Sequence, residues 1–365
     1  MPSPASDEIR AAIAAAGGAL RFDHFIDLAL YGAGGFYTSG GSAGRRGDFI
    51  TSPEVGPLFG AVVARWLDAE WRRLGAPDRF DLIEAAAGPG TLARSIVAAG
   101  PECIAALRYT AVEVSDAQRA RHPNGVVSIP TMPTEPITGV VIANELLDNL
   151  AFRLFVMDGG WREAHVVEQR DGTFAEVLRD VADLDDLAHL RLPVGAPHGA
   201  RMPIQQRAGE WAREAFDTIV SGRLLLIDYT SATTVDLAMR PWRDWLRTYR
   251  AHERGVHYLR EPGSQDITTE VALDQLFAAV GDPDALRSQS QFLQRWGIDE
   301  LVEQGRRVWD EHAARPTVAA MAMRSRVREA EALCDPTGLG AFTVIEFAAD
   351  SSPAAVSKAA ETASF

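Results

Sequence analysis

The segment from Phe80 to Leu92 constrains the fold of this chain more than any other, because it joins an expected strand, a glycine-rich turn and an expected helix. Phe80–Ala85 predicts a short buried strand, and Thr91–Ala99 predicts the helix. In the turn, Gly88 and Gly90 let the backbone approach a ligand without a Cβ in the way. The segment therefore indicates either a nucleotide-type cofactor site or an ordinary turn of an α/β protein.

Two acidic residues beside this turn indicate which cofactor it would accept. Glu113 lies at the end of the next expected strand, where a carboxylate can accept hydrogen bonds from ribose hydroxyls. Glu84 lies at the tip of the first strand, where it would repel the pyrophosphate of a dinucleotide. S-adenosylmethionine (SAM) has no phosphate and carries an ammonium and a sulfonium, so we interpret the turn as a SAM site. The alternative is that both carboxylates are solvated strand ends.

The remaining pattern predicts an α/β domain over residues 76–349. Its sheet is expected to contain mostly parallel strands covered on both faces, over Phe80–Ala85, Tyr109–Val114, Gly125–Ile129, Val140–Ala143 and Arg223–Tyr229, with a last strand at Phe342–Phe347. A helix over Glu210–Val220 leads into the fifth strand. In an insertion over residues 151–209, Asp-Gly pairs between alternating runs predict a small antiparallel β-meander. Residues 1–75 predict an N-terminal helical extension or lid, and residues 350–365 a disordered tail.

Composition excludes several classes of protein. The 365 residues include 36 basic and 50 acidic ones, and the net charge of −14 argues against non-specific binding to nucleic acid or anionic membranes. The two cysteines, Cys103 and Cys334, favour thiols in a reducing compartment, and no metal-ligand spacing occurs. No apolar run is long enough to span a membrane, and residues 1–20 do not resemble a signal peptide. We expect a soluble, cytoplasmic protein without a metal; a homodimer is compatible with the sequence.

The run from Ala143 to Asp148 supplies candidate catalytic residues. It lies where the fourth strand is expected to give way to a helix, at the sheet edge where α/β proteins bind ligands. Asn144, Glu145 and Asp148 would then face the cofactor crevice, and the two carboxylates would share one helical face. Such a pair can bind a guanidinium through two hydrogen bonds and align its nitrogen with the methyl group. The alternative is helix capping, with Asn144 as N-cap.

Two further segments supply candidate site residues. Asp228 and Tyr229 end the fifth strand, where they can orient a substrate nitrogen or form only local hydrogen bonds. In the segment from Gly47 to Glu54, Ser52 is suited to cap the following helix with Pro53 at its first position. Capping does not account for Phe49, which is suited to cover an adenine or a methyl-transfer pocket.

These segments together resemble the MidA family of SAM-dependent methyltransferases, relatives of the mitochondrial complex I assembly factor that methylates an arginine. The resemblance rests on FIDLALYGAGGFYT (25–38), GDFITSPEVGPLFG (47–60), EAAAGPGTL (84–92), VEVS (112–115), ANELLDNLAFRLF (143–155), LLLIDYT (224–230), REPGSQDITTEV (260–271) and FLQRWGI (292–298). It implies a class I methyltransferase sheet, Rossmann-like, with an antiparallel last strand. It also implies that the cofactor is surrounded by Thr51, Ser52, Glu84, Gly88, Gly90, Glu113, Ser115, Asn144 and Glu145.

The chain departs from the family pattern at three places. Ala86 replaces an expected glycine, which would take space near the backbone and weaken SAM binding. Thr230 stands where glycine is usual, and the segment 201–205 lacks an acidic residue often found there. Our leading prediction is a methyltransferase that modifies an arginine of a protein client. The alternatives are an assembly factor with the same fold and no catalysis, and a methyltransferase for a small molecule.

Overall fold

The computed structural model describes residues 3–39, 51–181, 192–250 and 253–349. They form two compact units, each assembled from separate stretches of the chain. Unit 1 comprises Met1–Phe49, Glu145–Arg213 and Asp228–Asp282, and unit 2 comprises Ile50–Asn144, Glu214–Ile227 and Pro283–Phe365. Residues 1–75, predicted as one extension, are therefore distributed over both units. Phe49 and the tail 350–365 lie outside the described residues.

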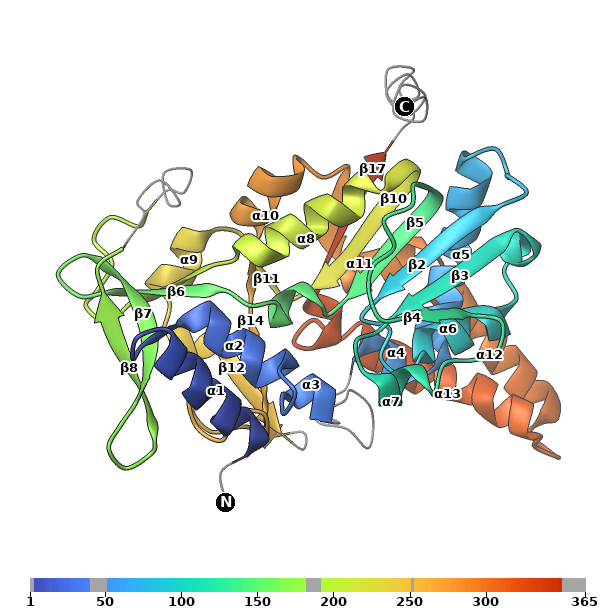
Figure 1. Ribbon diagram of the computed structural model, residues 1–365. Helices are drawn as coiled ribbons and strands as arrows, with labels where there is room; N and C mark the ends of the chain where they lie inside the picture. Colours follow the sequence, from blue (N-terminus) through green and yellow to red (C-terminus); the bar gives the residue numbers. More distant parts are fainter. Residues whose placement is uncertain (1–2, 40–50, 182–191, 251–252, 350–365) are drawn as a thin grey trace. The chain divides into compact units, whose positions relative to one another are not determined.

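Unit 2 is built on a seven-stranded sheet with the order β16-β17-β10-β5-β2-β3-β4 (Figure 1). The pairs among β4, β3, β2, β5 and β10 are parallel, whereas β16 and β17 are antiparallel. The strands are β2 (Phe80–Ala85), β3 (Leu107–Val112), β4 (Val127–Ile129), β5 (Ile137–Asn144), β10 (Ile219–Asp228), β16 (Ala285–Ser288) and β17 (Thr343–Ala349). This mixed, mostly parallel order confirms the predicted class I methyltransferase sheet.

Helices complete unit 2. They are α4 (Ser52–Val55), α5 (Pro57–Arg73), α6 (Thr91–Ala99), α7 (Asp116–Arg119), α11 (Gln289–Arg295), α12 (Ile298–His312) and α13 (Val318–Leu333), with 3-10 turns η1 (Glu102–Ala105) and η5 (Leu339–Ala341). Gly60 lets α5 approach α6 closely, because a Cβ there would lie 2.3 Å from the Ser95 Cβ. Within the described ranges, no helix is both long and apolar enough to cross a membrane.

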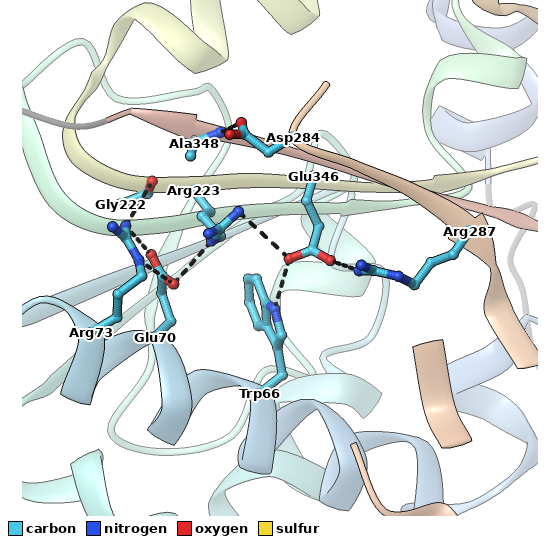
Figure 2. A network of polar contacts seen from close by, with 9 residues as sticks. All are labelled: Trp66, Glu70, Arg73, Gly222, Arg223, Asp284, Arg287, Glu346 and Ala348. Carbon is cyan, nitrogen blue, oxygen red and sulfur yellow. Dashed lines mark hydrogen bonds and ion pairs between the residues drawn. The ribbon is translucent and has the colours of Figure 1, made fainter. Parts of the chain in front are cut away.

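A polar network joins α5 to the sheet of unit 2 (Figure 2). The buried carboxylate of Glu346, on β17, accepts a hydrogen bond from Trp66 Nε1 at 3.2 Å and pairs with Arg287 on β16. Arg223, on β10, lies 3.9 Å from the same carboxylate and 3.0 Å from Glu70 on α5. Glu346 therefore connects three neighbouring strands to one helix.

Unit 1 contains the predicted meander. β6 (Arg153–Met157), β7 (Trp161–Glu168) and β8 (Phe174–Arg179) pair antiparallel in chain order, and β1 (Leu20–Arg21) and β9 (Arg201–Ile204) extend the same sheet. Helices α1 (Pro4–Ala15) and α2 (Phe22–Tyr31) contribute to its apolar core. In this core the centroids of the Phe22 and Phe152 rings are 5.5 Å apart. The other elements are α3 (Phe36–Ser39), η2 (Leu147–Asn149), β11 (Thr230–Ser231), α9 (Thr234–Met239), η4 (Trp242–Asp244), β12 (Leu246–Arg250), β13 (Glu253–Arg254), β14 (Asp266–Thr269), β15 (Val271–Ala272) and α10 (Leu273–Val280).

Some predicted boundaries differ from those observed. The helix expected over Glu210–Val220 is α8 (Gln206–Asp217), and β10 already begins at Ile219 because it pairs with β5 from Ile137 onward. The strand expected to end at Val114 ends at Val112, since its partner β4 ends at Ile129 opposite Val112 and Ser115 begins a helical turn.

Candidate active site

The turn after β2 in unit 2 is held by the Glu113 carboxylate. Gly88 N–H donates to its Oε2 at 3.0 Å, and Ser115 N–H donates to its Oε1 at 2.8 Å. Gly88 (φ 52°) and Gly90 (φ 77°) adopt left-handed conformations, and the space beside Gly88 is open, since an added Cβ would meet nothing within 4 Å. Each carboxylate oxygen can accept a second hydrogen bond, so Glu113 can hold the turn and still bind ribose hydroxyls.

Glu84 lies inside β2 rather than at a solvated strand tip. Its carboxyl is buried and accepts a 2.6 Å hydrogen bond from the hydroxyl of Tyr109, on the neighbouring strand β3. Burial raises the pKa of Glu84 to about 8, and the negative charge of Glu113 contributes to the rise. A cation placed beside Glu84 would favour its charged form and lower this pKa. The alternative in which Glu84 and Glu113 are merely solvated strand ends does not describe the structure, because both are buried.

Ala86 affects the turn through its backbone. Its φ of 53° is left-handed, a conformation that costs a residue with a Cβ about 1–2 kcal/mol. The Ala86 side chain is exposed. The expectation that its methyl group takes space against a closely packed backbone is therefore wrong, and the penalty is conformational.

The segment before α5 has a different cap from the one predicted. Thr51, and not Ser52, is the N-cap of α4. Ser52 lies in the first turn, and its fully buried hydroxyl donates to Gln289 Oε1 at 2.8 Å. Glu54 accepts a hydrogen bond from Thr91, at the start of α6, so α4 is fastened to the helix that follows the glycine turn. Cofactor contacts by Thr51 and Ser52 stay predictions.

The chain leaves β5 at Asn144 without entering the expected helix. Glu145 has a left-handed φ of 55°, and the short 3-10 helix η2 follows over Leu147–Asn149. The prediction that Glu145 and Asp148 share a helical face is wrong. The physical reason is the Asp228 carboxylate, which accepts the N–H groups of Leu147 at 2.9 Å and Asp148 at 3.3 Å and so fixes a turn.

Asp228 holds backbone in unit 1. Its Oδ2 accepts hydrogen bonds from the backbone N–H groups of Leu147 and Asp148, and its Oδ1 accepts one from the Tyr229 N–H at 2.8 Å. The side chain is buried, and burial together with the charges of Asp148 and Glu145 raises its pKa well above the ordinary value. Of the two roles considered for Asp228, this geometry favours local hydrogen bonding. Burial and the Glu145 charge also raise the pKa of the Tyr229 hydroxyl.

Asp148 is a second buried carboxyl beside Asp228. It is 4% exposed, and its Oδ2 accepts a 2.5 Å hydrogen bond from Thr268 Oγ1. Burial raises the pKa of Asp148 to about 6, so a fraction of the carboxyls takes up a proton near neutral pH. Within unit 1, Glu145, Asp148, Asp228 and Tyr229 are thus brought into electrostatic contact.

Sequence reasoning missed several residues that contact the carboxyls at the glycine turn and around Asp148. They are Tyr109 beside Glu84, and Asp266, Thr268, Asn149 and Tyr37 beside Asp148. Four of the five fall inside segments that carry the family resemblance, which was the available signal; Tyr109 differs because it contacts Glu84 only across the sheet. Among the residues described, no group of three or more His, Cys, Asp and Glu side chains is arranged to hold a metal ion.

The residues of the glycine turn fit SAM by their chemistry. Two buried carboxyls, Glu84 and Glu113, interact electrostatically beside an open left-handed glycine, which suits a cationic ligand with ribose hydroxyls and no phosphate. With its strand order, unit 2 therefore has the architecture of a class I methyltransferase. A family model described as "Putative S-adenosyl-L-methionine-dependent methyltransferase" matches residues 62–290, and the chain belongs to this family.

Individual proteins that resemble this chain are also methyltransferases or bind a methyltransferase product. Protein arginine methyltransferase NDUFAF7 homolog, mitochondrial, from Drosophila melanogaster is 28% identical over 65% of this chain, which spans 61% of that protein. The Mus musculus protein arginine methyltransferase NDUFAF7, mitochondrial, is 27% identical over 73% of this chain and 68% of its own length. A crystal structure from Burkholderia thailandensis, bound to S-adenosyl-homocysteine, superposes with a TM-score of 0.80 at 27% identity, covering 95% of this chain and 94% of that one. These findings confirm the predicted resemblance and cofactor.

Proposed function

We propose that this protein transfers the methyl group of SAM to a nitrogen of an arginine side chain in a protein client. The observation that carries the proposal is Asp148, a buried carboxylate with one oxygen tied by Thr268 and with two further carboxyls, Asp228 and Asp266, near enough to perturb its charge. Such a site favours a cation that offers N–H donors. The names of the relatives, which describe protein arginine methyltransferases, support the same substrate.

The acidic residues follow directly on the cofactor unit along the chain. Asn144 ends β5 in unit 2 and is bonded to Glu145, and Ile227 on β10 is bonded to Asp228. β5 and β10 are adjacent parallel strands, paired at Asn144 and Ile227. In open α/β sheets, residues that follow the carboxyl ends of such strands along the chain commonly contribute to ligand sites.

SAM supplies an electrophilic methyl group: the S–C bond breaks with its electron pair left on sulfur, a nitrogen lone pair forms the N–C bond, and one N–H proton must leave. Asp148 is suited to accept that proton, because a carboxyl with a pKa of about 6 is largely ionised near neutral pH and still basic enough to share a proton. We assign Glu84 and Glu113 to SAM binding, and Asp148 to holding the guanidinium and receiving the proton.

Radiolabelled methyl transfer tests the proposal. The purified protein and methyl-labelled SAM are added to a lysate from cells that lack the gene, and the labelled protein is hydrolysed to amino acids. We expect the label in methylarginine. Label in another amino acid or in a small molecule would contradict the arginine assignment, and absence of label would favour the assembly factor without catalysis.

Two variants separate cofactor binding from turnover. We expect Glu113→Ala to lose SAM binding in a calorimetric titration, because the Gly88 turn and the ribose both lose their acceptor. Asp148→Asn should bind SAM normally and lose turnover. Tight SAM binding by the first variant, or normal turnover by the second, would remove the role assigned to that residue.

A cytoplasmic location is part of the proposal and is supported by the thiols of Cys103 and Cys334, which are not joined in a disulfide. Imaging of a fluorescent fusion in the source cell tests it.

A further inference from the structure

Two residues of β14 face the short helix that carries Asp148. Asp266 and Thr268 are two positions apart in a strand, so their side chains lie on the same face. Thr268 Oγ1 donates to Asp148 Oδ2 at 2.5 Å, and Asn149 Nδ2 donates to Asp266 Oδ1 at 3.0 Å. One face of β14 thus holds two consecutive side chains of η2.

Tyr37 supports the Asp266 end of this arrangement. Its hydroxyl donates to Asp266 Oδ1 at 2.9 Å. The Tyr37 ring stacks on the Tyr31 ring, with centroids 5.4 Å apart and planes at 20°, and the Tyr31 hydroxyl donates to the Asn149 carbonyl at 3.4 Å. The stack restricts the Tyr37 ring, so Asp266 receives two donors from fixed directions.

Asp148 Oδ1 is the atom that these contacts leave available. It is buried and has no hydrogen-bond partner of normal geometry among the residues that the structure describes, although the backbone N–H groups of Asp148 and Asn149 lie near the carboxyl and favour its charged form. A buried carboxylate oxygen is costly without a donor, so it is expected to receive a hydrogen bond from water or a ligand. The charge of Asp148 raises the pKa of both Asp228 and Asp266, so the three carboxyls lie close together.

The chemistry of the available atom favours a planar cation. Asp148 interacts electrostatically with Asp228, Asp266, Tyr37 and Tyr229 and with the cation Arg247. Glu145 adds a negative charge that acts on Asp228 and Tyr229. Glu270 accepts from Arg247 Nη2 at 2.9 Å, so part of that positive charge is already balanced. A guanidinium adds positive charge and offers several N–H groups in one plane, which suits a buried carboxylate oxygen that has no hydrogen-bond partner and lies near aromatic hydroxyls.

We propose that Thr268, Asp266 and Tyr37 are positioning residues, which hold η2 so that Asp148 Oδ1 accepts a hydrogen bond from a guanidinium-type cation of the substrate. Thr268 ties the other oxygen of Asp148. Asp266, held by Tyr37, ties the next residue, Asn149. The inference rests on the proposed function, because arginine is the protein side chain that carries such a cation.

Binding of a small cation tests the inference without SAM. The full-length protein is titrated with N-acetyl-arginine methylamide and with its neutral citrulline counterpart, and binding is followed by NMR. We expect the arginine probe to bind about tenfold more tightly than the citrulline probe, a difference of about 1.4 kcal/mol. Thr268→Val should weaken arginine binding by about tenfold, whereas Thr268→Ser, which keeps the hydroxyl, should restore it.

Thr269→Val is the matched control. Thr269 is the next residue of β14, is also buried, and its hydroxyl donates to the Glu270 carbonyl at 3.4 Å. The Thr269→Val variant should bind the arginine probe as tightly as the unaltered protein. In turnover assays, Thr268→Val and Asp266→Asn should raise KM for the arginine substrate, while KM for SAM and the binding of S-adenosylhomocysteine stay unchanged.

Failure of the inference differs from failure of the proposed function. The inference is overturned if the unaltered protein does not bind the arginine probe, or if Thr268→Val matches Thr269→Val in probe binding and KM. It stands if probe binding depends on Thr268 while the label from SAM enters a residue other than arginine, a result that contradicts only the proposed function.

Discussion

At the scale of single residues, the left-handed alanine in the cofactor turn has a measurable consequence. Ala86→Gly removes a backbone penalty of about 1–2 kcal/mol and adds the entropic cost of glycine, about 0.5–1 kcal/mol. We expect the free energy of unfolding to rise by about 0.5–1 kcal/mol, measured by chemical denaturation. We also expect Kd for SAM to fall about threefold, because the turn no longer resists the conformation that the site uses.

Ala76 provides a control for this substitution. It belongs to the same unit, has the same φ of 53°, and lies in the turn after α5, away from the glycine turn in sequence. Ala76→Gly should change stability by a similar amount and leave Kd for SAM as it was. Equal changes in SAM affinity for both variants would show that Ala86 acts through stability alone.

The sequence predicted individual elements well where the signal is local. The observed bounds of β2 and α6 equal the predicted ones, since β2 is an apolar run that ends at a glycine-rich turn and α6 ends before Gly100. The sheet of β12, β13 and β14 was missed, because its strands are short and partly polar. The turn after Asn144 was misassigned because its cause, Asp228, lies more than eighty residues away.

At the scale of elements, Glu346 should matter to stability more than any exposed ion pair. Glu346 is 5% exposed, and its carboxylate interacts with Trp66, Arg287 and Arg223 (Figure 2). Glu346→Ala leaves the Arg287 guanidinium without this partner and should lower the free energy of unfolding by about 3–5 kcal/mol. Glu346→Gln keeps an acceptor for Trp66 and should lower it by about 2 kcal/mol. Urea denaturation measures both.

The exposed ion pair between Arg72 and Glu102 is the comparison for this network. The two side chains are 52% and 62% exposed, so water and salt already screen their interaction. Glu102→Gln should leave the free energy of unfolding nearly unchanged. If Glu346→Ala lowered the free energy of unfolding as little as Glu102→Gln, the network would contribute no more to stability than an exposed ion pair.

At the scale of the whole molecule, the chain is interleaved in a way that local sequence patterns do not reveal. It passes between the two units five times, at residues 49–50, 144–145, 213–214, 227–228 and 282–283. β1, near the start of the chain, pairs with β7 more than 140 residues later. Predicted domains were continuous stretches because periodicity identifies elements and not their long-range partners. The candidate residues nevertheless lie close to these crossings, at Asn144, Glu145 and Asp228.

Buried carboxyls should make the protein less stable as pH rises, which is the reverse of ordinary acid denaturation. Burial raises the pKa of Asp148 to about 6, of Asp266 to about 7 and of Glu84 to about 8. The folded protein therefore binds more protons than the unfolded chain between the ordinary carboxyl pKa, about 4, and these values. Their contribution to stability is complete below about pH 4 and is lost as pH rises through about 6 to 8.

The net charge of −14 acts in the same direction, because self-repulsion also grows as carboxyls ionise, and salt separates the two effects. We expect the free energy of unfolding to fall between about pH 5.5 and about pH 8.5 at both about 0.05 M and about 0.5 M salt, since salt screens surface charges and not buried ones. Asp266→Asn should reduce the slope by up to about 1 kcal/mol per pH unit, whereas Asp180→Asn, at an exposed position, should not. A slope that disappears at high salt would assign the whole effect to surface repulsion.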